Sequence, residues 1–181
     1  MKNLFLFLVL FVSNFVICQT SHRVTKSDIN YVDSINKTFN KENVEKEFLI
    51  LLNKYRKDNG LDTLTISKEA SDACKYQTEY CFKNNILTHT NPNLGYENLT
   101  NRLKKFGLLN SDTKKRAECG VTFITFELCV QRICVAQRML DIWKMSPPHN
   151  SILLYKDVDK IGIHISKEIN SSIYSFIIIH N

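Results

Sequence analysis

The chain has 181 residues, of which 44% are hydrophobic, and this is enough to build the core of a single domain. Its formal net charge is +6 at pH 7, from 24 Lys and Arg residues against 18 Asp and Glu residues. The basic residues are scattered, their densest run is Lys114-Lys115-Arg116, and no ladder of aromatic residues interleaves with them. These features argue against a nucleic-acid-binding protein, so we expect no nucleic-acid partner.

The first 18 residues have the layout of a removable secretory signal peptide. Lys2 supplies a positive charge, residues 4–17 are almost entirely apolar, and Val16 and Cys18 precede a cleavage site before Gln19. The apolar run is shorter than the roughly 20 residues that a spanning helix needs. We therefore predict a secreted protein, extracellular or periplasmic, with no transmembrane segment in the mature chain. An uncleaved anchor or a lipid-modified Cys18 is the alternative.

The mature chain divides into a short lead-in and one domain. Residues 19–41 are mostly polar and have no clear period, which predicts a poorly ordered lead-in. Residues 42–181 carry regular hydrophobic patterns throughout and predict a single, monomeric globular domain.

Three helices are predicted in the first half of the domain, over residues 44–55, 67–84 and 99–106. Gly60 follows the first helix and is a natural stop after its C-terminal end. Ser67 is placed to cap the second helix, and Glu69 lies in its first turn. Gly107 ends the third helix.

The second half of the domain adds strands. Residues 121–128 are rich in Phe, Ile and Thr and predict a strand, and residues 131–145 predict a helix that the prolines at 147 and 148 end. Residues 158–166 and 173–180 predict an antiparallel hairpin, and the apolar run 176–179 indicates a strand buried on both faces. This order of elements favours an α+β fold over a doubly wound one.

Five cysteines remain after a cut at residue 18: Cys74, Cys81, Cys119, Cys129 and Cys134. An odd number leaves at least one without a partner in the chain, although export permits disulfides. Cys74 and Cys81 on one helix would have Cα atoms about 10 Å apart, which is beyond the roughly 7 Å that a disulfide tolerates. Cys129 can pair with Cys134 if the helix starts between them, Cys119 can pair with any of the others, and no zinc-finger spacing is present.

Several segments together resemble the CAP superfamily, which contains cysteine-rich secretory, antigen 5 and pathogenesis-related 1 proteins with an SCP-like domain. They are Leu52–Lys57 with Gly60, Leu61 and Leu64; Arg102 with Gly107; and Trp143-x-x-Ser146-Pro147-x-His149 with its apolar continuation. The resemblance covers about residues 45–181 and is nearest to the compact secreted bacterial branch. It implies a three-layer α-β-α sandwich, in which helices flank a small antiparallel sheet.

The resemblance also implies a central cleft, which the family lines with two histidines and two glutamates. By position His89 and His149 correspond to the histidines and Glu118 to the first glutamate. Ser146 stands at the second glutamate, so the full set is absent. Cys119 replaces the asparagine that commonly follows the first glutamate. Glu97, within Gly95-Tyr96-Glu97-Asn98, is an alternative to Glu118, but it precedes Arg102 and so comes too early in the order.

These residues leave three functions open. The favoured one is a binding module for an extracellular lipid, cell-surface component or protein, whose polar cleft holds His89, Glu118, Ser146 and His149. Two imidazoles and a carboxylate, from His89, His149 and Glu118, suit a weakly held zinc ion, and the alternative is a cleft whose histidines bond only to neighbours. A metal-assisted hydrolase with His149 or Glu118 as base is disfavoured by the missing carboxylate, and no catalytic residue is assigned. A purely structural domain is the third.

Overall fold

The computed structural model describes residues 40–109, 115–124, 132–166 and 172–181. The predicted signal peptide and all but the end of the lead-in lie outside these residues, as does Cys129. The first described helix begins at Lys41, close to the predicted start of the domain.

The described residues form five helices and one sheet of four strands. The helices are α2 (Lys41–Asp58), α3 (Lys68–Asn84), α4 (Leu99–Lys105), α5 (Arg132–Met145) and α6 (Pro147–Leu153), and the strands are β1 (Thr65–Ile66), β2 (Arg116–Ile124), β3 (Lys160–Ser166) and β4 (Ser172–His180). The strand order is β1-β3-β4-β2. Strands β3 and β4 form the predicted antiparallel hairpin.

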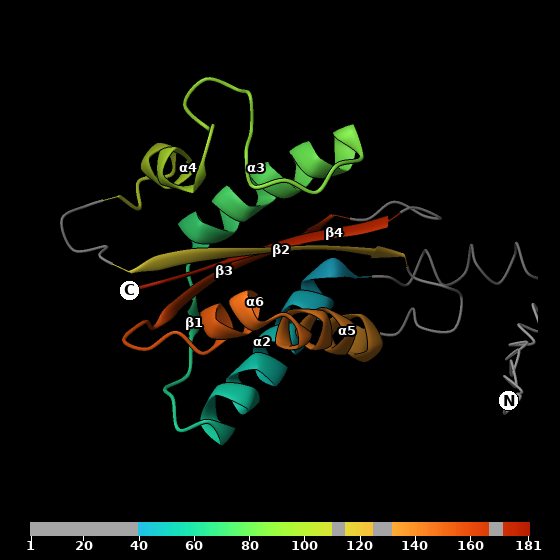
Figure 1. Ribbon diagram of the computed structural model, residues 1–181, viewed down its shortest axis with the longest axis vertical. Coiled ribbons are helices and arrows are strands. Elements are labelled where there is room, and N and C mark those ends of the chain that lie inside the picture. The colour runs from blue at the N-terminus through green and yellow to red at the C-terminus, as the bar shows by residue number, and fades with distance from the viewer. Residues whose placement is uncertain (1–39, 110–114, 125–131, 167–171) are drawn as a thin grey trace, which may run out of the picture.

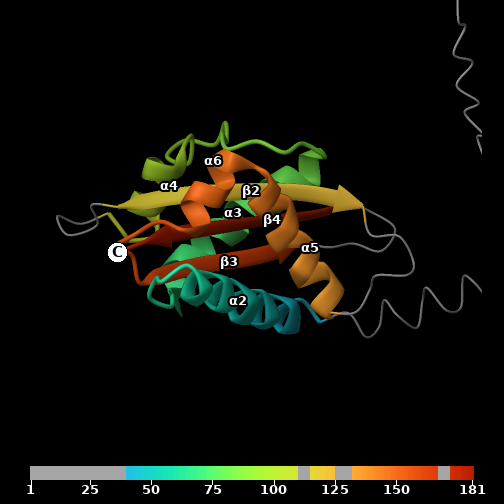
Figure 2. The same cartoon turned by 60° about the horizontal axis from the view of Figure 1, so that its bottom comes forward.

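The sheet is the middle of three layers. Helices α3 and α4 cover one face, and helices α2, α5 and α6 cover the other (Figures 1 and 2). The predicted α+β sandwich is therefore confirmed. The sheet itself is mixed rather than purely antiparallel, because the two residues of β1 pair in parallel with Lys160 and Ile161 of β3.

Strand β4 lies inside the sheet and supplies both cores. Ile177 and Ile179 belong to the core shared with α2, α5 and α6, whereas Phe176 and Ile178 belong to the core shared with α3 and α4. All four side chains are completely buried. The prediction of a strand buried on both faces is confirmed.

Local sequence explains where the helices begin and end. Ser67 caps α3 by accepting a hydrogen bond from the backbone nitrogen of Ala70, as predicted. Residues 147–153 form helix α6, which was not predicted, because Pro147 and Pro148 end α5 and also fit the first turn of the next helix. Strand β2 begins at Arg116, five residues before the predicted start, because Arg116 and Glu118 are charged and do not show the apolar pattern of a strand.

Helix α3 packs unusually close to strand β3. A Cβ atom at Gly162 would lie 2.2 Å from the carbonyl carbon of Ala70 and 2.5 Å from its oxygen. Only glycine fits there, so this residue sets the distance between the two layers.

Among the described residues, no helix combines the length and apolar character that crossing a bilayer requires.

Candidate functional site

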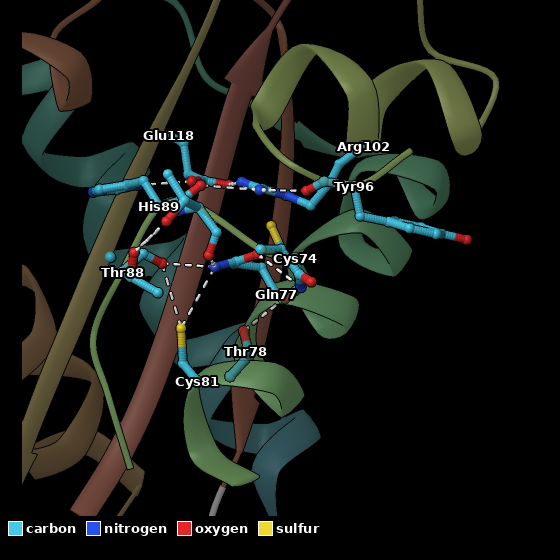
Figure 3. Close-up of polar contacts among 12 residues, drawn as sticks. Cys74, Gln77, Thr78, Cys81, Thr88, His89, Tyr96, Arg102 and Glu118 are labelled. Atoms are coloured by element: carbon cyan, nitrogen blue, oxygen red, sulfur yellow. Dashed lines mark hydrogen bonds and ion pairs between the residues drawn. The ribbon is translucent and has the colours of Figure 1, made fainter. Parts of the chain in front are cut away.

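Glu118 lies near the start of β2, and its carboxylate contacts the side chains of His89 and Arg102 (Figure 3). Its Oε1 is 2.7 Å from Nδ1 of His89, and its Oε2 is 2.5 Å from Nη2 of Arg102. The Glu118 side chain is only 4% exposed and that of Arg102 is 0% exposed. A carboxylate buried in this way is stabilised by its partners, and both of its oxygens are occupied.

The backbone around His89 is clamped by side chains from α3 and α4. Gln77, on α3, donates from Nε2 to the carbonyl oxygens of Thr88 at 2.6 Å and Thr90 at 3.2 Å. Arg102, on α4, donates from Nη1 to the carbonyl oxygen of His89 at 3.0 Å. Three successive carbonyl groups are therefore satisfied by two buried side chains, and this fixes the loop that presents the imidazole.

Contacts with Phe176 and Glu118 fix the orientation of the His89 imidazole. Its ring stands edge-on to Phe176 of β4, with centroids 5.7 Å apart. An ionised carboxylate only accepts hydrogen bonds, so a neutral His89 that donates to it carries its hydrogen on Nδ1 and has its lone pair on Nε2. The side chain is 53% exposed, so Nε2 is the atom offered to a ligand.

His149 approaches from the opposite layer. It lies on α6, and its Nδ1 is 2.9 Å from Oγ of Ser146, the residue that precedes this helix. The Sγ of Cys119, the neighbour of Glu118 on β2, lies 4.0 Å from the backbone oxygen of His149. Burial lowers the pKa of His149, and the nearby His89 lowers it further. The two histidines are thus electrostatic neighbours, one on either side of the edge strand β2.

Glu97 takes no part in this arrangement. Its carboxylate accepts hydrogen bonds from the backbone nitrogen of Gly95 at 3.0 Å and from Nδ2 of Asn101 at 2.7 Å. These bonds, that of Gly95 first, lower the pKa of Glu97. Of the two candidate carboxylates, Glu118 is the one that contacts His89.

The four predicted cleft residues therefore form two hydrogen-bonded pairs, His89 with Glu118 and Ser146 with His149. Within the described ranges, no group of three or more His, Cys, Asp or Glu side chains is arranged to hold a metal ion. Of the predicted ligand triad, the contact that the structure gives is that of Glu118 with His89, and the second oxygen of Glu118 contacts Arg102.

Two residues of the site were not predicted in their present roles. Arg102 entered the sequence argument only as part of the family resemblance, yet it is the buried counter-ion of Glu118. Gln77 lies within the predicted helix 67–84 and was given no role in the site, yet it holds the His89 loop. Neither role leaves a local signal, since each depends on a contact more than ten residues away in sequence.

The described cysteines are free. Cys74, Cys81 and Cys119 are buried thiols, so the prediction that Cys74 does not pair with Cys81 is confirmed. The side chains of Cys129 and Cys134 lie outside the described part of the chain.

Comparison with known families identifies the class. The model of the CAP family, described as the cysteine-rich secretory protein family, matches residues 49–178. The chain belongs to this family.

Solved structures share its fold at low sequence identity. An outer surface protein of Borrelia burgdorferi has a TM-score of 0.62 at 20% identity, over 78% of this chain and 93% of that one. An extracellular SCP-domain protein of Bacillus anthracis has a TM-score of 0.63 at 18% identity, over 89% of this chain but only 45% of its own. NaASP2, crystallised with Zn²⁺, has a TM-score of 0.53 at 11% identity, over 80% of this chain and 82% of its own. No curated protein matches the chain.

Proposed function

We propose that this chain is an exported CAP domain that acts as a binding module, and that His89 and His149 together bind a zinc ion in its site. The observation that carries the proposal is the contact between Nδ1 of His89 and the buried Glu118. A carboxylate on one ring nitrogen of a histidine, with the other nitrogen exposed, is the usual outer support of a zinc ligand.

His149, the second proposed ligand, also has a hydrogen-bond partner at Nδ1. In the proposed site Nδ1 of His149 donates its hydrogen to Oγ of Ser146, 2.9 Å away, and Nε2 of that ring is then left for a ligand. The lowered pKa of His149 favours the neutral imidazole, and only this form binds a metal. Residue 146 thus supports a histidine, although it lacks the carboxylate that the family resemblance implies.

Glu118 is a positioning residue in this proposal rather than a ligand, because its side chain is only 4% exposed and its oxygens contact His89 and Arg102. Zinc ordinarily takes four ligands, so two imidazoles leave places for water or for a polar group of the partner. A bound zinc would supply a Lewis acid at an exposed site. Two protein ligands also account for the weak binding that we expect.

Binding is favoured over hydrolysis by the state of the carboxylate. A general base must reach the substrate, and the Glu118 side chain is only 4% exposed and is held by Arg102 and His89. The partner that we propose is an extracellular lipid, a cell-surface component or a protein. Export is supported by the relatives named as an outer surface protein and an extracellular protein, and by the layout of residues 1–18.

Calorimetric titration of the mature protein with zinc tests the site. The wild type should bind one equivalent, and the His89→Ala, His149→Ala double variant should bind none. Glu118→Gln should weaken binding about 10- to 100-fold, because the support of His89 is lost. Glu97→Gln is the matched control and should bind as the wild type does. An absence of saturable binding in the wild type, or equal binding in the double variant, would refute the metal site.

A further inference from the structure

A second concave surface lies apart from the histidines. It is an open groove of about 450 Å³ between the exposed face of α3 and the residues that follow Thr90. Its walls include two tyrosines, two asparagines and one charge of each sign: Tyr76, Tyr80, Asn84, Asn93, Glu79 and Lys83. None of these residues belongs to the proposed zinc site, which uses Gln77 on a different side of the same helix.

The aromatic wall of the groove is held rigidly. The ring of Tyr76 stacks on that of Tyr96, with centroids 4.0 Å apart and planes inclined by 20°. Phe106 packs against both rings, and its ring centroid lies 6.3 Å from that of Tyr76 and 6.3 Å from that of Tyr96. A fixed aromatic surface costs little further entropy when a ligand packs on it.

The polar groups of the groove are also set before any ligand arrives. Nδ2 of Asn93 donates to the hydroxyl of Tyr76 at 2.9 Å, so this hydroxyl can pass its own hydrogen to a ligand. The backbone nitrogen of Asn93 donates to Oδ1 of Asn91 at 3.1 Å and steadies the loop. Nδ2 of Asn84 donates to the carbonyl oxygen of Tyr80 at 2.8 Å, which leaves its Oδ1 as an acceptor.

The chemistry of the lining selects one class of ligand. The lining holds one charge of each sign, Glu79 and Lys83, and Glu79 also pairs with Lys75 at 3.8 Å, so no strong charge of either sign is offered to a ligand. The groove is open and its lining mixes amides, phenols and charges, whereas a lipid site would be enclosed and mainly apolar. A neutral molecule with many hydroxyl groups fits this mixture, since each hydroxyl both donates and accepts while its C–H surfaces pack on a ring.

We infer that this groove binds a neutral oligosaccharide, and that the protein therefore has a carbohydrate site in addition to its histidine site. Tyr76 and Tyr80 supply the stacking surface. Asn84, Asn93 and the tyrosine hydroxyl groups bond to the hydroxyl groups of the sugar.

Titration of the mature protein with three tetrasaccharides tests the inference: chitotetraose, cellotetraose and maltotetraose. We expect at least one to bind with a Kd of roughly 1 mM or below, a common range for weak recognition. Asn84→Ala and Tyr80→Ala should each weaken that binding at least tenfold. Circular dichroism and urea unfolding of the same variants show whether they remain folded.

The His89→Ala, His149→Ala double variant is the matched control and should bind the sugar as the wild type does, so failure of the zinc site leaves this test intact. Two results would overturn the inference. One is that none of the three sugars binds at concentrations up to roughly ten times that Kd. The other is that binding is unchanged in both groove variants.

Discussion

Arg102 and Glu118 form an ion pair from which solvent is almost entirely excluded, with Nη2 and Oε2 2.5 Å apart. Nε of Arg102 is buried and has no hydrogen-bond partner among the described residues, so the guanidinium depends on the carboxylate and on backbone carbonyl groups for compensation. The pair connects α4 to β2, and through Oε1 it reaches His89. The carboxylate of Glu118 thus both orients His89, the proposed metal ligand, and contributes to the stability of the domain.

Glu118→Gln should lower the free energy of unfolding by about 3–5 kcal/mol, because it leaves a buried guanidinium without its counter-ion. Urea unfolding followed by circular dichroism measures the change. Glu97→Gln removes a carboxylate that is only partly buried and should cost much less. Equal costs for the two variants would show that Arg102 is compensated by other means.

Gly162→Ala tests the contact between α3 and β3. The new methyl group would meet the backbone of Ala70 and Ser71, which cannot rotate away as a side chain can. We expect a loss of about 1–3 kcal/mol or more, the usual cost of overpacking. Gly107→Ala is the control: no atom of the described residues lies within 4 Å of its Cβ position, and its φ of +78° alone should cost about 1 kcal/mol. A smaller loss at Gly162 than at Gly107 would contradict the close contact.

The thiols of Cys74, Cys81 and Cys119 should resist alkylation in the native protein. Each side chain is completely buried. Burial raises the pKa of all three thiols, so little thiolate forms at pH 8. Mass spectrometry of peptides after treatment with iodoacetamide should find these cysteines unmodified in buffer and modified in urea. Equal modification in both conditions, or a Cys74–Cys81 disulfide, would contradict the structure.

Sequence patterns predicted the elements whose signals are local. The apolar period of α2, the Ser67 cap of α3 and the apolar run of β4 each lie within a few adjacent residues. The parallel pairing of β1 could not be predicted, because two residues carry no period and their partners lie 95 positions away. Helix α6 was missed for a related reason, since a proline pair serves equally to end one helix and to begin another.

Sequence patterns predict still less of the candidate site, because its contacts join residues that are distant in sequence. Family resemblance named His89, Glu118, Ser146 and His149, but no pattern gave Arg102 and Gln77 their roles of holding Glu118 and the His89 loop. Glu118 is recognised as the partner of His89 only when β2 is seen to begin before it. The bonds from Gln77 to the His89 loop follow from the packing of α3, which sequence period alone does not specify.

Glu45 and His164 should make opposite contributions to the dependence of stability on pH. Oε1 of Glu45 accepts a hydrogen bond from the backbone nitrogen of Ile165 at 3.1 Å and lies 3.5 Å from Nδ1 of His164. Burial raises the pKa of Glu45 from 4.5 to about 7. Burial also lowers the pKa of His164 from 6.5 to about 4, with Lys41 and Lys75 adding to the effect. Both groups are thus neutral over much of the acidic range.

The direction of each contribution follows from which state holds the proton. From pH 4.5 to about 7 the folded protein keeps a proton on Glu45 that the unfolded chain has lost, so this contribution falls as pH rises. From about pH 4 to 6.5 the unfolded chain keeps a proton on His164 that the folded protein has lost, so this contribution rises. In the wild type the two largely cancel where the intervals overlap.

Single variants separate the two contributions. Relative to the wild type, Glu45→Gln should become more stable as pH rises from 4.5 to about 7, and its amide can still accept from Ile165. His164→Gln should become less stable relative to the wild type as pH rises from about 4 to 6.5. Urea unfolding at half-unit pH steps measures both differences, and contributions from all other groups cancel in them. If Glu45 and His164 were instead a charged pair, each pKa would shift the other way and both slopes would reverse.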